Sequence, residues 1–142
     1  MSYMLDTNVL NWLVDEHIKP EDLPAGEYFV THIQIEELMA AADQERRTRL
    51  TLVLVELRPT RVNTESMVMD VSRWDNANWG DGVVFDKLRT ILDGLNKGKA
   101  NNVQDALIGE VCILKGYTLL TADKHLAEAV KQHGGKVQLF TR

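Results

Sequence analysis

Apolar and polar residues are patterned along this chain so as to predict short buried strands separated by helices. Short runs of β-branched, aromatic and aliphatic residues predict strands at 3–5, 28–31, 117–121 and 136–140. Longer stretches, in which apolar residues recur every three or four positions or strong helix formers dominate, predict helices. We expect these helices at 7–14, 32–45, 49–57, 63–74, 83–95, 102–115 and 123–133.

Proline and glycine mark the boundaries between these elements. Three of them fall within 19–26, which predicts a loop with a possible helical turn, and Pro59 ends the helix before it. Gly116 is well suited to follow the end of a helix. The resulting order, β-α-β-α-α-α-α-α-β-α-β, predicts an α/β fold: a three-layer α/β/α sandwich with a mostly parallel central sheet, formed by one domain over residues 1–142.

Composition places the chain among ordinary globular proteins. Its 142 residues suit a single domain with a real core, and no apolar run approaches the roughly 18 residues that a membrane helix requires. We find no secretory signal, and the single Cys112 allows no internal disulfide, so we expect a reducing cytoplasm.

The formal net charge of −5 argues against a protein that coats nucleic acid by charge alone. It does not exclude an enzyme that acts on RNA. Two groups of basic residues, Arg46/Arg47/Arg49 and Arg58/Arg61, are most simply interpreted as exposed positions at a helix end and in a loop.

Four acids carry the candidate chemistry. Asp6 and Asp123 each follow a predicted strand, whereas Glu37 and Asp105 lie near the starts of predicted helices. In a parallel sheet the carboxyl ends of the strands meet at one edge, where ligands bind. Carboxylates gathered there repel one another and are tolerated if they hold protons or a hard cation. The combination therefore indicates a divalent-metal site that hydrolyses phosphodiester bonds.

Each acid also has a purely structural interpretation. Asp6 and Asp123 occupy positions typical of helix caps. Asp105 falls in the first turn of a helix, where the helix dipole stabilises an anion, and Glu37 can be an ordinary helical glutamate.

Short polar residues stand beside the acids. Thr7, Asn8 and Thr121 could orient a carboxylate, a water molecule or a phosphate oxygen, or the two threonines could simply cap helices. Asn102, one turn before Asp105, could cap its helix or reach the site.

Other kinds of site find less support. The four histidines lack zinc-like spacing, and no glycine-rich phosphate loop is present. A phosphatase with a nucleophilic aspartate usually has a second acid two residues after the first, and here Asn8 takes that position.

The motifs resemble those of the PIN-domain family. The resemblance is carried by Met4–Leu10 around Asp6, by the Glu37–Leu38 pair, by Asp105–Ile108 and by Thr121–Asp123, and it spans the whole chain. Glu36 stands beside Glu37, and periodicity does not choose between them. Glu37 is preferred because Leu38 follows it, as in the family's Glu-Leu pair.

This resemblance implies a metal centre of Asp6, Glu37, Asp105 and Asp123, with Thr121 as a polar helper. It also implies dependence on Mg²⁺ or Mn²⁺ and cleavage of RNA. Small members of the family are commonly VapC-like toxins that form homodimers and are blocked by an antitoxin protein. The remaining alternatives are a non-toxin nuclease of the same fold that acts in RNA processing, and a binding module without catalysis.

The middle of the chain, Arg46–Lys99, matches no motif of the family. Trp74 and Trp79 in this segment could stack on unpaired bases or belong to the core. A dimer would need an exposed apolar patch, for which the candidates are Leu52, Leu54, Val55 and Leu57.

Overall fold

A parallel five-stranded sheet forms the centre of the molecule, in the strand order β3-β2-β1-β4-β5. The computed structural model describes residues 1–40, 42–65, 82–96 and 102–141. Each pair of neighbouring strands is parallel. The strands are β1 (Ser2–Leu5), β2 (Glu27–Val30), β3 (Thr60–Arg61), β4 (Thr118–Thr121) and β5 (Lys136–Leu139).

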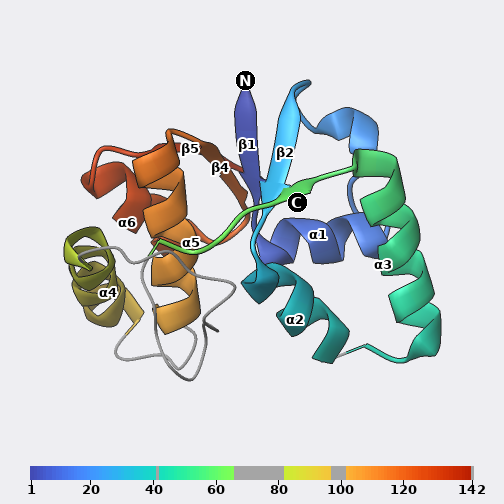
Figure 1. Ribbon diagram of the computed structural model, residues 1–142, viewed down its shortest axis with the longest axis horizontal. Coiled ribbons are helices and arrows are strands. Elements are labelled where there is room, and N and C mark those ends of the chain that lie inside the picture. The colour runs from blue at the N-terminus through green and yellow to red at the C-terminus, as the bar shows by residue number, and fades with distance from the viewer. Residues whose placement is uncertain (41, 66–81, 97–101, 142) are drawn as a thin grey trace.

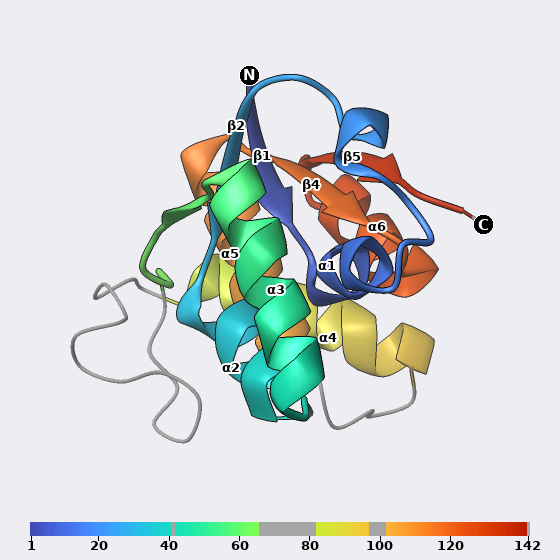
Figure 2. The same cartoon turned by 90° about the vertical axis from the view of Figure 1, so that its right-hand side faces the viewer.

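Helices cover both faces of this sheet, which confirms the α/β/α sandwich. Three helices, α1 (Thr7–Val14), α2 (His32–Ala40) and α3 (Gln44–Leu57), lie on one side. The other side carries α4 (Val83–Asn96), α5 (Asn102–Lys115) and α6 (Lys124–Gln132) (Figure 1). Figure 2 views the molecule from the side of α1 and α3, with α5 and α6 behind the sheet. A short 3-10 turn, η1 (Pro20–Asp22), occupies the loop before β2.

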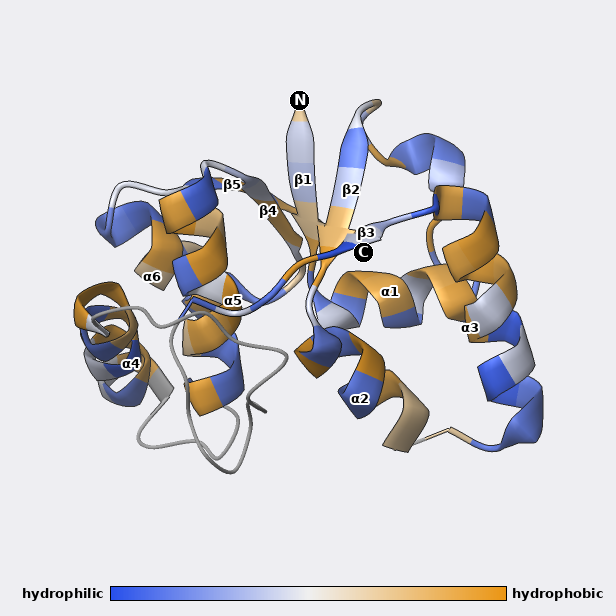
Figure 3. Ribbon diagram, in the orientation of Figure 1, coloured by the Kyte–Doolittle hydropathy of each residue, from blue (hydrophilic) through white to orange (hydrophobic). Residues whose placement is uncertain are grey.

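The strands divide their apolar side chains between two cores. Met4 and Leu119 pack against α4, α5 and α6, whereas Leu5 and Leu120 pack against the opposite helices. This alternation follows from the two-residue period of a strand. In Figure 3 the carboxyl-terminal halves of β1 and β2 are the apolar halves. Cys112 lies in the first of these cores with 1% of its surface exposed, as a small apolar residue would.

Most sequence-predicted elements lie within a residue or two of their expected bounds, but the long helix expected at 32–45 is wrong. Helix α2 ends at Ala40 and α3 begins at Gln44. Asp43 has an extended backbone, and its side chain accepts a 2.8 Å hydrogen bond from Arg46 N. This cap starts a new helix, five residues earlier than the expected start at Arg49.

Two further differences follow α3. The structure adds the short strand β3 directly after Pro59, where two residues are too few to give a periodic pattern. The expected helix at 63–74 is not present at 63–65, and its remaining residues lie outside the described ranges. Trp74 and Trp79, together with most of the expected loop at 75–82, also lie outside them.

The strand order reverses between β1 and β4, which are neighbours although they are far apart in sequence. Leu5 pairs with Leu120, so Asp6, the first residue after β1, and Thr121, the last residue of β4, lie side by side at the carboxyl edge of the sheet. Such a reversal point is where open α/β sheets bind ligands. No helix within the described residues is long and apolar enough to cross a membrane.

Candidate metal centre at the carboxyl edge of the sheet

Asp6 is held at the junction of β1 and α1 by several hydrogen bonds. Its Oδ1 accepts from Thr7 N at 2.8 Å, which caps α1, and its Oδ2 accepts from the Thr121 hydroxyl at 2.6 Å. Its backbone N–H donates to Leu120 O at 3.0 Å. Only 4% of Asp6 is exposed. One carboxylate therefore starts a helix and at the same time contacts the neighbouring strand.

Thr121 links the two aspartates. Its oxygen also accepts a hydrogen bond from Asp123 N at 3.0 Å, so one hydroxyl joins the end of β1 to the start of α6. Asp123 caps α6 by accepting from His125 N at 2.9 Å and Leu126 N at 3.2 Å. Asp6 and Asp123 thus both cap helices, as their structural interpretation predicted. They also lie close together, because both are bound to Thr121.

Asn8 provides a second tie across the same junction. Its side-chain oxygen accepts from Ala122 N at 3.0 Å, which joins α1 to the turn after β4. The hydroxyl oxygen of Thr7 is buried and has no hydrogen-bond partner of normal geometry among the described residues. It lies close enough to Glu37 to lower the pKa of that carboxyl.

Burial is the main reason that the pKa of Asp6 rises from 3.8 to about 6. The hydrogen bonds from Thr121 and Thr7 oppose this rise, and the negative charge of Asp123 adds to it. Burial removes water from the charged form, and a like charge nearby destabilises it further.

Glu37 shows the same effect from α2. Its burial, and then the negative charge of Asp6, raise its pKa from 4.5 to about 7. Glu36 is exposed on the outer side of the helix, whereas Glu37 is half-buried. The fold therefore favours Glu37 over Glu36 as the acid that belongs with Asp6.

Asp105 lies in the first turn of α5, and 8% of it is exposed. Figure 1 shows that α5 begins on the side of the molecule toward which β1 runs. Asn102, which starts the same helix, donates a 2.8 Å hydrogen bond from Nδ2 to Asp93 on α4. This bond braces α5 against α4, and Asn102 therefore supports the helix that carries Asp105.

The acids suit an oxygen-liganded cation. Among the described residues, no three His, Cys, Asp or Glu side chains meet closely enough to hold an ion between them as they stand. Mg²⁺, however, usually keeps several waters and is held by one or two protein carboxylates. Asp6 is electrostatically coupled both to Asp123 and to Glu37. A buried carboxylate that two partly buried ones repel, near a buried threonine hydroxyl, is the environment that a divalent cation stabilises.

Two buried polar residues near these elements were not singled out from the sequence. Gln34 is fully buried, and its side chain donates to Leu5 O at 3.0 Å. The signal for it was the Thr-x-x-Gln spacing from Thr31, which is that of a capping box. Glu110, with 1% of its surface exposed, accepts from Phe85 N at 3.0 Å in the first turn of α4. No local pattern distinguishes it from an exposed helical glutamate.

The basic groups do not gather around the acids. Arg46 binds Asp15 and Asn11 on α1, and Arg49 pairs with Glu45 one turn before it. Arg58 ends α3 in a left-handed conformation with φ of 51°. Arg46 thus joins α3 to α1, which is a structural role.

Comparisons with known proteins place the fold. The family model described as "PIN domain" matches residues 3–132. No curated protein sequence matches the chain.

Several solved structures share the arrangement of elements. VapBC2 from Rickettsia felis, solved bound to a DNA fragment from its promoter, is 17% identical with a TM-score of 0.62, covering 99% of this chain and 100% of that one. A domain of a functionally unknown protein from Methanocaldococcus jannaschii is 16% identical with a TM-score of 0.58, covering 99% of this chain and 91% of that one. PAE2754 from Pyrobaculum aerophilum is 17% identical with a TM-score of 0.53, covering 96% of this chain and 92% of that one. At these identities the likeness establishes the fold.

Proposed function

This chain belongs to the PIN domain family, and on that premise we propose that it is a Mg²⁺- or Mn²⁺-dependent endoribonuclease, the toxin of a toxin–antitoxin pair. The observation that carries the proposal is the junction at the carboxyl edge of the sheet, where the Thr121 hydroxyl donates to Asp6 Oδ2 and accepts from Asp123 N, and where the charge of Asp6 raises the pKa of Glu37. Glu37 lies within α2 and caps no helix, so capping does not explain its place beside Asp6. Together with Asp105 at the start of α5, these acids offer oxygen ligands for a hard cation.

Each residue has a part in the proposed hydrolysis. Asp6, Glu37, Asp105 and Asp123 would hold the ion, and Thr121 holds Asp6 and the backbone of Asp123 in place through its hydroxyl. The ion, when bound, activates a water molecule and stabilises negative charge on the phosphate. One of the acids accepts the proton of the attacking water. The water oxygen bonds to phosphorus, the P–O3′ bond breaks, and the 3′ oxygen takes up a proton from solvent, which leaves a 5′-phosphate and a 3′-hydroxyl.

The test is cleavage of a panel of RNAs with and without Mn²⁺, with the cleaved ends mapped. Asp6→Asn should abolish cleavage and leave the fold intact, because asparagine caps a helix about as well as aspartate does. Asp43→Asn makes the same exchange at the exposed cap of α3 and should leave activity unchanged. Full activity of Asp6→Asn, or of the wild type in chelator, would refute the proposal.

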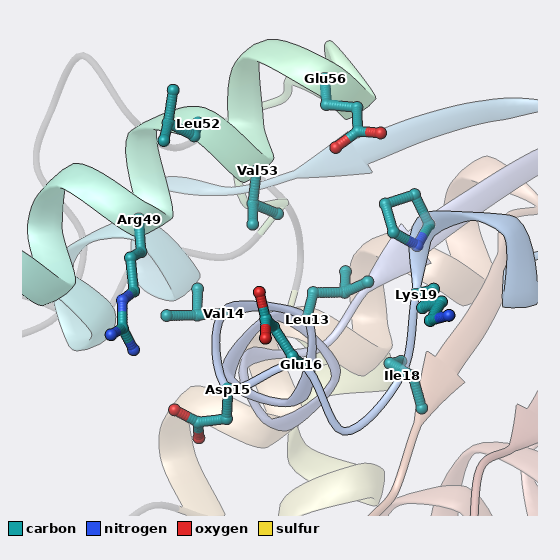
Figure 4. Close-up of a pocket in the computed structure, with 11 residues that line it drawn as sticks. Leu13, Val14, Asp15, Glu16, Ile18, Lys19, Arg49, Leu52, Val53 and Glu56 are labelled. Carbon is teal, nitrogen blue, oxygen red and sulfur yellow. The ribbon is translucent and has the colours of Figure 1, made fainter.

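A groove between α1 and α3 supports the proposal that an antitoxin binds this protein. It has a volume of about 560 Å³, and its apolar lining includes Leu13, Val14 and Val53 (Figure 4). Glu16 projects between the two helices, and Glu56 lies at the rim. Asp15, Lys19 and Arg49 also line it. Asp15 and Arg49 are each paired with a residue of α3, which leaves two acids, Glu16 and Glu56, against one lysine. We assign the groove to a segment of an antitoxin with apolar side chains and at least one basic residue.

Growth arrest on expression would favour the toxin over a non-toxin nuclease that acts in RNA processing. The arrest should disappear in Asp6→Asn and when the product of a neighbouring small gene is co-expressed. Val53→Glu, which places a charge in the groove, should prevent that rescue while cleavage persists. A protein that neither binds Mn²⁺ nor cleaves RNA would instead be a binding module.

We also propose a homodimer. Of the apolar candidates on α3, Val55 is 62% exposed and is the side chain left for this contact. Leu52 is 64% exposed but lines the groove assigned to the antitoxin, while Leu54 and Leu57 pack against the core. Sedimentation at micromolar concentration should give a dimer. A species that sediments only as a monomer would remove this part of the proposal.

A further inference from the structure

Gln34 is a fully buried polar side chain at the carboxyl edge of the sheet. Its Oε1 accepts hydrogen bonds from Thr31 N at 3.0 Å and from the Thr31 hydroxyl at 2.5 Å. Its Nε2 donates to Leu5 O at 3.0 Å and contacts Met4 Sδ at 3.1 Å. One carboxamide therefore connects the end of β2 to the end of β1.

The acceptor end of this carboxamide completes a helix cap. Thr31 accepts from Ile33 N at 3.1 Å through its hydroxyl, while Gln34 accepts from the Thr31 backbone. This reciprocal pair is a variant of the capping box, in which the threonine hydroxyl accepts from the second helical N–H, that of Ile33, and not from the third. It caps the start of α2. A glutamate would serve this purpose equally well, so the cap alone does not require glutamine.

The donor end explains the amide. Leu5 O, which accepts from Gln34, belongs to the peptide bond whose N–H is that of Asp6. That N–H donates to Leu120 O at 3.0 Å. The peptide group before Asp6 is thus held from both sides, by α2 through Gln34 and by β4 through its backbone.

Glu37 lies three residues after Gln34, one turn further along α2. The carboxamide therefore orients two acids together: Asp6 through the preceding peptide bond, and Glu37 through the start of its helix. A glutamate at position 34 would lack the donor for Leu5 and would add negative charge beside acids that already repel one another.

We infer that Gln34 is a positioning residue that holds Asp6, directly after β1, and Glu37, on α2, in the arrangement from which they bind a divalent cation. The inference rests on the proposed metal-dependent function and adds a residue that contacts neither the ion nor the RNA. Residues that orient metal ligands typically change metal affinity by about 10–100-fold when they are replaced.

The experiment measures Mn²⁺ affinity by calorimetry and the free energy of unfolding in denaturant for the same full-length proteins. Gln34→Met keeps the length of the side chain and removes its hydrogen bonds. Gln34→Asn keeps the amide on a stem too short to span Thr31 and Leu5. Gln132→Met makes the same glutamine-to-methionine exchange at an exposed position on α6. Val130→Ala, at a buried position on the same helix, lowers the free energy of unfolding.

Both Gln34 variants should bind Mn²⁺ about 10–100-fold more weakly, and kcat for RNA should fall more than KM rises. Val130→Ala should keep wild-type affinity even if its loss of stability is as large. Wild-type affinity in both Gln34 variants, an equal loss in Val130→Ala, or failure of both Gln34 variants to fold would overturn the inference. Absence of Mn²⁺ binding by the wild type would refute the proposed function itself, and the inference would fall with it.

Discussion

The hydroxyl of Thr121 donates a 2.6 Å hydrogen bond to Asp6 Oδ2 between residues 115 positions apart in the chain. Both groups are buried. The bond joins the ends of β1 and β4, the two strands between which the strand order reverses. It also opposes the rise in the pKa of Asp6 that burial causes. It is therefore both a fold contact and a control on the charge of the candidate site.

Replacing Thr121 by valine removes this bond with little change of shape. The pKa of Asp6 should then rise above about 6, because its charged form loses a donor. The free energy of unfolding should fall by about 1–3 kcal/mol, the usual cost of leaving a buried polar group unpaired. Carboxyl NMR titration and denaturant unfolding measure the two effects. Thr118→Val, in the same strand, should change neither, and an unchanged Asp6 titration in Thr121→Val would contradict the assigned bond.

The pH dependence of stability should reveal Glu37. Its pKa is about 7 in the folded protein against 4.5 in its ordinary state, so the folded protein retains a proton that the unfolded chain releases. The resulting stabilisation is complete below pH 4.5 and is lost as the pH rises through 7. In the absence of metal, the unfolding free energy of the wild type minus that of Glu37→Gln should therefore decrease as the pH rises from 4.5 through 7.

Glu36→Gln is the matched control for that measurement, since Glu36 is the exposed neighbour on the same helix. This variant should retain the decline seen in the wild type. If Glu36→Gln removed the decline and Glu37→Gln did not, the choice of Glu37 would be reversed.

Mn²⁺ should stabilise the folded protein, because it offsets the repulsion between the buried Asp6 and its partly buried neighbours Glu37 and Asp123. For an ion that binds only the folded state, a concentration 100 times Kd adds about 2.7 kcal/mol to the unfolding free energy. The rise in Tm should be reversed by chelator, be absent in Asp6→Asn and persist in Asp43→Asn. Equal stabilisation of Asp6→Asn would place the binding elsewhere in the molecule.

Alanine should change the free energy of unfolding differently at two helical glycines. A Cβ at Gly109 on α5 would lie 3.1 Å from Leu88 Cδ1 and 3.1 Å from Val130 Cγ2, so these side chains on α4 and α6 would have to move by a few tenths of an ångström. A Cβ at Gly94 would meet no atom of the described residues within 4 Å. Gly94→Ala should stabilise the protein by about 0.5–1 kcal/mol through helix propensity.

Gly109→Ala gains the same propensity but loses about 1–3 kcal/mol to overpacking, so it should be neutral to destabilising. Denaturant unfolding of the two variants measures the contrast. Equal stabilisation by both would show that α5 is packed less tightly than these distances indicate.

Local residue patterns were sufficient for much of the fold. The bounds of α1 and α5 match the expected bounds. The signals for them are the spacing of apolar residues, the capping residue and the residue after the helix, and each acts over only a few positions. The same local signals placed Asp6 and Asp123 at strand-to-helix junctions. The signal failed at Asp43, where a single cap divides one expected helix into α2 and α3.

The arrangement of the candidate site depended on the tertiary structure. Periodicity treated Glu36 and Glu37 alike, and only the packing of α2 made one exposed and the other a neighbour of Asp6. Gln34 carried a recognisable local pattern with Thr31, but its bond to Leu5 joins residues 29 positions apart. Helix starts and strand ends are encoded in short windows of sequence. Which side chains meet, and how far burial shifts their pKa, follows from contacts between distant segments, which no short window contains.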